Sequence, residues 1–79
     1  MVYELYEKTT ENDDVKEWAF YVVFTGSEPS PNERPFASGH CFLGIDDAEG
    51  CRRYEDGRQD TQFEVERLNR NAQPPSRHR

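Results

Sequence analysis

The sequence predicts a small α+β domain, an antiparallel sheet of about four strands with one short helix in the order β-β-β-α-β. Two strand-like apolar runs, Trp18–Thr25 and Phe36–Ile45, predict the centre of the sheet, and a helix-capping signal follows the second run. The chain has 79 residues, which is the size of one domain. Only 33% of the residues are hydrophobic but 13% are aromatic, so large rings are expected to supply most of the core.

The first two strands are expected to form an antiparallel hairpin. Val2–Lys8 mixes charged residues with Tyr, Val and Leu, which is typical of a strand, and Glu11–Asp14 is a turn signal. The segment after this turn also fits one face of a helix, but from about residue 16 its aromatic and β-branched residues favour a strand. Because its apolar residues run on without alternation, we expect a central strand that is buried on both faces.

A proline-rich loop separates the second strand from the third. Residues 26–35 contain three prolines, which lack the N–H group that a strand ladder needs. Phe36–Ile45 then forms the predicted third strand. Successive side chains of a strand point to opposite faces, so His40 and Cys41 are expected on opposite sides of the sheet.

A helix and a last strand complete the predicted fold. Asp46 and Glu49 suggest a capping box for a short helix over about 47–56, with Gly57 as its terminator. Gln62–Leu68 alternates apolar and acidic residues, which predicts a fourth, amphipathic strand.

Charge divides the chain into an acidic body and a basic end. The net charge is −6, and residues 1–51 alone carry eleven acidic and three basic residues. We therefore expect one acidic domain over 1–69 and a disordered basic tail over 70–79, where apolar anchors are lacking. The sequence shows no signal peptide and no apolar run long enough to span a bilayer, which predicts a cytoplasmic protein with no membrane partner.

The cysteines and histidines do not form a recognisable catalytic or metal-binding motif. A thiol enzyme that uses Cys51 or Cys41 with His40 is an alternative to the binding functions described below. It is disfavoured because His40 and Cys41 alternate across a strand and because Cys51 is expected in the middle of a helix. Cysteine and histidine spacing matches no zinc motif, and the acidic runs do not form a calcium loop. We predict no enzymatic activity, no cofactor and no metal site.

Acidic side chains gather at two predicted turns and are the candidate partner-binding residues. They are Glu11, Asp13, Asp14 and Glu17 around the first turn and Asp46, Asp47 and Glu49 at the helix start. An acidic surface attracts basic protein surfaces and repels nucleic acid, so direct nucleic-acid binding is disfavoured. The sequence thus predicts a non-enzymatic protein-binding module.

Two forms of this prediction differ in the partner. The sharper form is an inhibitor or regulator of a nucleic-acid-handling complex, such as a phage or mobile-element antagonist that mimics the charge of nucleic acid. The alternative is a structural subunit that forms a homodimer or larger homo-oligomer through an exposed sheet face, because one short helix is too small to cover a whole sheet.

Overall fold

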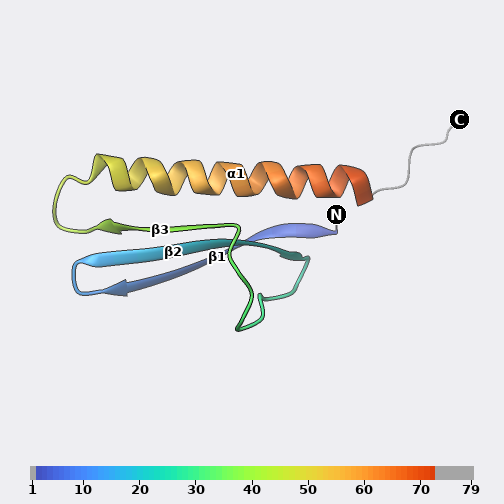
Figure 1. Ribbon diagram of the computed structural model, residues 1–79, viewed down its shortest axis with the longest axis horizontal. Helices are drawn as coiled ribbons and strands as arrows, with labels where there is room; N and C mark the ends of the chain where they lie inside the picture. Colours follow the sequence, from blue (N-terminus) through green and yellow to red (C-terminus); the bar gives the residue numbers. More distant parts are fainter. Residues whose placement is uncertain (1, 73–79) are drawn as a thin grey trace, which may run out of the picture.

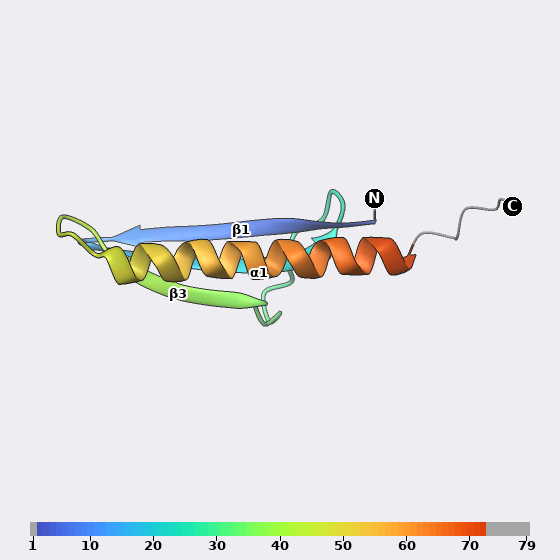
Figure 2. The ribbon, with the colours of Figure 1, turned by 90° about the horizontal axis from the view of Figure 1, so that it is seen from above.

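A three-stranded antiparallel sheet carries one long helix along one of its faces. The computed structural model describes residues 2–72, with strands β1 (Tyr3–Asn12), β2 (Val15–Phe24) and β3 (Ala37–Phe42) and helix α1 (Ala48–Ala72). The strand order is β1-β2-β3, and α1 runs nearly parallel to the strands above the sheet (Figures 1 and 2). The predicted α+β class and central position of the second strand are confirmed, whereas the described residues contain three strands and not four.

The first two strands form the predicted antiparallel hairpin, and both are ten residues long. Their register pairs Tyr3 with Phe24 at one end and Asn12 with Val15 at the other, which leaves a two-residue turn. Asp13 in that turn has a φ of 56°, a left-handed conformation that Asp tolerates better than most residues. The turn is therefore confirmed, and β1 runs up to it, four residues beyond the predicted end at Lys8.

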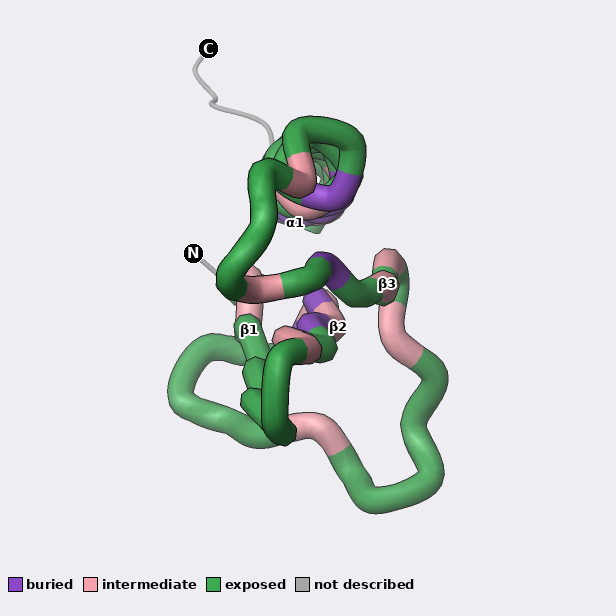
Figure 3. Tube along the Cα trace, turned by 90° about the vertical axis from the view of Figure 1, so that its left-hand side faces the viewer, coloured by how far each residue is buried: buried purple, intermediate pink, exposed green. Residues whose placement is uncertain are grey.

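Most buried residues lie where α1 and the sheet face each other (Figure 3). Trp18 and Phe20 of β2 point towards the helix and are 4% and 0% exposed. The expectation that both faces of β2 are buried is wrong, because Tyr21 and Ala19 on the opposite face are only partly covered and Val23 alone is buried there. One helix covers one face, and no second layer among the described residues covers the other.

Helix α1 replaces both the short predicted helix and the predicted strand over 62–68. Its inward face is marked by five buried residues at helical spacing, Gly50, Gly57, Thr61, Val65 and Asn69. Val65 is the only large apolar residue among them, so the helical period is almost invisible as a hydrophobic pattern. Phe63, which suggested strand alternation with Val65, is 57% exposed and lies on the outer side of the helix.

Gly57 lies within the helix and does not end it, and its small size serves helix packing. A Cβ atom at this position would stand 3.0 Å from Cζ3 of Trp18 and 3.3 Å from Cβ of Ala37. Gly39 of β3 makes the same kind of approach from the sheet, where a Cβ would lie 2.6 Å from Cζ2 of Trp18. The Trp18 indole is thus held between two glycines.

Asn69 fastens the C-terminal half of α1 to the start of β1. Its Oδ1 accepts hydrogen bonds from Val2 N (3.1 Å) and Tyr3 N (2.8 Å), and its Nδ2 donates to Tyr3 O (3.1 Å). The first part of the predicted tail, residues 70–72, continues the helix, while 73–79 lie outside the described residues. No helix within residues 2–72 combines the length and the apolar character that a membrane span requires.

Candidate functional site

The two acidic turns lie side by side at one end of the molecule. The β1–β2 turn and the β3–α1 loop are both at the left of Figure 1. A backbone hydrogen bond joins them, because Leu43 N donates to Asp14 O at 2.7 Å. Four exposed carboxylates of these turns form what we name the acidic end, namely those of Glu11, Asp13, Asp14 and Asp46.

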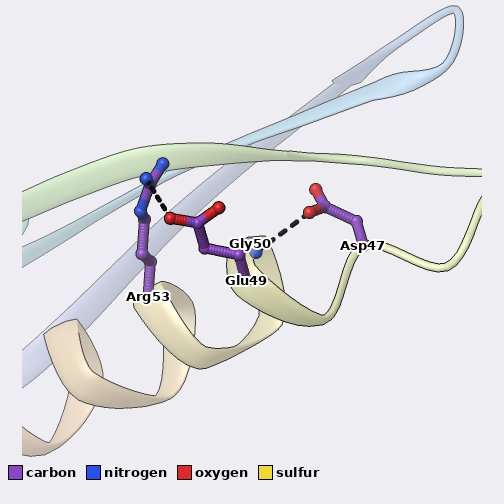
Figure 4. Close-up of polar contacts among 4 residues, drawn as sticks. All are labelled: Asp47, Glu49, Gly50 and Arg53. Carbon is purple, nitrogen blue, oxygen red and sulfur yellow. Dashed lines mark hydrogen bonds and ion pairs between the residues drawn. The ribbon is translucent and has the colours of Figure 1, made fainter.

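Asp47 and Glu49 are engaged in holding the helix. Asp47 is the N-cap of α1, since its Oδ1 accepts from Gly50 N at 3.0 Å (Figure 4). Its Oδ2 accepts from Phe42 N at 2.8 Å. These backbone donors, Phe42 N first and Gly50 N second, lower the pKa of Asp47. The predicted capping box of Asp46 and Glu49 is wrong by one position, and Glu49 instead forms an ion pair with Arg53 at 2.7 Å.

Glu17 belongs to a different surface from the other predicted acids. In the sheet it stands between Thr10 of β1 and His40 of β3, on the face turned away from α1. We name this face the open face. It holds a shallow depression lined by Lys8, Thr10, Glu17, Ala19, Tyr21, Ser38 and His40 among others. Aromatic contacts flank the depression, with Tyr6 against Tyr21 on one side and His40 against Phe42 on the other.

His40 and the two thiols lie on opposite sides of the sheet. Cys41 is buried beneath α1, where its Cβ would be 2.7 Å from a Cβ built on Gly50, whereas His40 lies on the open face as the alternation predicts. Cys51 is the fourth residue of α1 and not a mid-helix residue as expected, and it is exposed on the helix side of the sheet. Within residues 2–72, no three His, Cys, Asp or Glu side chains are arranged to hold a metal ion.

A polar cluster that sequence reasoning missed links the helix to β1. Tyr54 Oη donates to Glu7 Oε2 at 2.6 Å, and the Lys16 ammonium stands 4.8 Å from the centroid of the Tyr54 ring. The Tyr54 hydrogen bond, with a smaller contribution from Thr9, lowers the pKa of Glu7, and the same carboxylate raises the pKa of Tyr54. The partners are 47 positions apart, so no local pattern could reveal the contact.

The Glu7–Tyr54 contact predicts a pH dependence of stability. Because the folded state lowers the pKa of Glu7, the stabilisation is present above the ordinary Glu value of about 4.3 and is lost as the pH falls further. Tyr54→Phe should lower the free energy of unfolding by about 1 kcal/mol at pH 7. It should also flatten the loss of stability between about pH 5 and pH 3.

Urea unfolding at a series of pH values measures this effect. Tyr6→Phe on the open face is the matched control, because no side-chain hydrogen bond of Tyr6 reaches the helix. If Tyr54→Phe kept the acid dependence of the parent chain, the hydrogen bond between Tyr54 and Glu7 would not be its cause.

Comparison with known proteins yields no relative: no family model, no curated protein sequence and no solved structure matches this chain.

Proposed function

We propose that this chain is a non-enzymatic protein-binding module whose acidic end docks on a basic protein surface. The observation that carries the proposal is the Leu43 N to Asp14 O hydrogen bond, which brings acidic residues from two separate connections together. The ion pairs of the described residues lie on α1, at Arg53 with Glu49 and at Arg67 with Glu64. The four carboxylates of the acidic end are thus available to a cationic partner.

The backbone that carries these carboxylates is firmly positioned. A two-residue hairpin turn fixes Asp13 and Asp14, and the cap made by Asp47 fixes the loop that bears Asp46. A preorganised charged surface loses little conformational entropy when it binds. Exposed charges of this kind act mainly by steering the encounter and by excluding partners of like charge.

The sharper form of the proposal concerns the identity of the partner. Proteins that handle nucleic acids present clustered Lys and Arg to phosphates, and an acidic end can compete for such a surface. We therefore propose an inhibitor or regulator of a nucleic-acid-handling complex, of the kind that phages and mobile elements direct against their hosts. The net charge of −6 and the small size of the chain support this form.

Amide replacement of the acidic end tests the docking surface. The test variant combines Glu11→Gln, Asp13→Asn, Asp14→Asn and Asp46→Asn. The control variant removes four exposed charges from the helix, through Glu55→Gln, Asp56→Asn, Asp60→Asn and Glu66→Gln. The partner is captured from cell extract on the immobilised chain and its affinity is then measured with purified components. The test variant should bind about tenfold or more weakly, and the control should bind nearly as well as the parent chain.

A salt titration of the same complex separates electrostatic docking from other modes. Affinity should fall steadily as the salt concentration rises, because screening acts on exposed charges. Salt-independent binding, or an equal loss in both variants, would contradict docking through the acidic end.

A further inference from the structure

The two edges of the sheet differ in how they are protected against pairing. The β1 edge carries four charged residues, Glu4, Glu7, Lys8 and Glu11. The other edge strand, β3, lies in a stretch from Phe36 to Ile45 that contains no Asp, Glu, Lys or Arg. Charged side chains are a common device that prevents edge strands from pairing with another chain. The β3 edge lacks it.

The backbone of β3 offers free hydrogen-bonding groups along this edge. Leu43 N points inwards to Asp14 O, whereas Phe42 N points outwards and is met by the Asp47 carboxylate. Since backbone groups alternate along an antiparallel strand, the N–H and C=O groups of Ser38 and His40 also point outwards. Figure 2 shows β3 running alongside α1 with its outer side away from the helix. In the described part of the chain, no strand pairs with this side.

The sequence of this strand is symmetric in residue class about Gly39. Reading outwards from Gly39, Ser38 corresponds to His40, a small Ala37 to a small Cys41, and Phe36 to Phe42. Phe36 and Phe42 are 49% and 47% exposed, so both rings are open to further contacts. A strand of this kind is complementary to itself when it is turned end for end.

We propose that β3 pairs with β3 of a second copy about a two-fold axis at Gly39, which joins two sheets into one of six strands. In this register Ser38 of each copy exchanges backbone hydrogen bonds with His40 of the other. Beyond these pairs the backbone N–H groups of Phe36 and Phe42 are already engaged, by Phe20 O and by the Asp47 carboxylate, so the contact there is between side chains. The exposed ring of Phe36 meets the exposed ring of Phe42 of the second copy, and cross-strand aromatic pairs of this kind stabilise a sheet.

Charge and topology both favour this arrangement over pairing through the open face. The open face carries Lys8 and Glu17, and stacking two such faces buries charges. Antiparallel pairing of β3 places the two acidic ends at opposite ends of the dimer, where chains of −6 net charge repel least. The remaining free edges are the charged β1 strands, so assembly stops at two copies.

Introducing opposite charges at positions 36 and 42 tests the proposed register. Phe42→Glu and Phe36→Lys should each weaken dimerisation at least tenfold in sedimentation velocity over a concentration series, because each removes one ring from both cross-strand aromatic pairs of the dimer. The double variant should recover most of the affinity, since carboxylate and ammonium then face each other twice. Within one strand the two positions lie about 20 Å apart, so the recovery is intermolecular. A monomeric parent chain at about 100 μM, or a double variant as weak as the single ones, would overturn the proposal.

Amide hydrogen exchange of the unaltered chain gives an independent readout. In the dimer the Ser38 and His40 amides should be protected, and dilution to monomer should expose them. Gly39 and Cys41, whose amides face β2, serve as internal controls that stay protected at both concentrations. If Ser38 and His40 exchange equally fast at all concentrations, the two copies do not pair through β3.

Discussion

Asn69→Leu is expected to lower the free energy of unfolding by about 3 kcal/mol, because it removes a buried amide that satisfies three backbone groups. The residue is 7% exposed, and its Oδ1 and Nδ2 bind Val2 N, Tyr3 N and Tyr3 O. Leucine has a similar size, so the lost contribution is that of the hydrogen bonds and not of volume. Chemical denaturation followed by far-UV circular dichroism measures the change.

Asn71→Leu is the matched control for this substitution. Asn71 lies two positions further along α1 and is exposed, so its replacement should change stability by less than about 0.5 kcal/mol. Equal effects of the two variants would show that the Asn69 amide does not hold the helix on β1.

Gly39→Ala is expected to cost about 2–3 kcal/mol, because the new methyl group collides with the Trp18 indole. The ideal Cβ position lies 2.6 Å from Cζ2 and 2.9 Å from Cη2 of that ring, well inside the usual carbon–carbon contact of about 3.5–4.0 Å. The ring cannot retreat towards the helix, where Gly57 already approaches it closely. Thermal and urea unfolding both report the loss.

A double-mutant cycle with Trp18→Phe identifies the cause. The smaller ring vacates the space that the alanine methyl needs, and it also removes a buried indole N–H that has no hydrogen-bond partner among the described residues. Gly39→Ala should therefore cost clearly less in the Trp18→Phe background than in the parent chain. Additive effects would place the strain in the β3 backbone and not against the ring.

Local sequence patterns predicted the hairpin and the third strand because their signals are short in range. The aromatic and β-branched run after the Asp13–Asp14 turn identified β2, and the turn itself fixed its pairing with β1. The antiparallel order of the strands brings the two predicted acidic turns to one end, which the sequence patterns did not reveal on their own. The engagement of Asp47 and Glu49 at the start of the helix was not predicted either, because a carboxylate in a cap and a carboxylate in an ion pair look alike in a sequence.

The helix was misjudged because its buried face is built from small and polar residues. Gly50 lies against Cys41, and Gly57 lies against Trp18. Thr61 and Asn69 are polar, but their buried side chains are satisfied by hydrogen bonds, Thr61 to Gly57 O and Asn69 to the β1 backbone. A hydrophobicity pattern registers none of these four positions as core. Their spacing becomes meaningful only once the neighbouring strand is known, since a glycine reads equally as a terminator or as a packing surface.

The Asn69–Tyr3 contact also bears on the order in which the chain folds. It joins residues 66 positions apart, so it closes a loop that spans nearly all of the described chain. The β1–β2 hairpin, in contrast, closes through a two-residue turn and pays little loop entropy. The amide tie therefore belongs after the transition state for folding: its loss should accelerate unfolding and leave the folding rate nearly unchanged. The start of β1 and the C-terminal part of α1 are then the last parts of the domain to assemble and the first to separate.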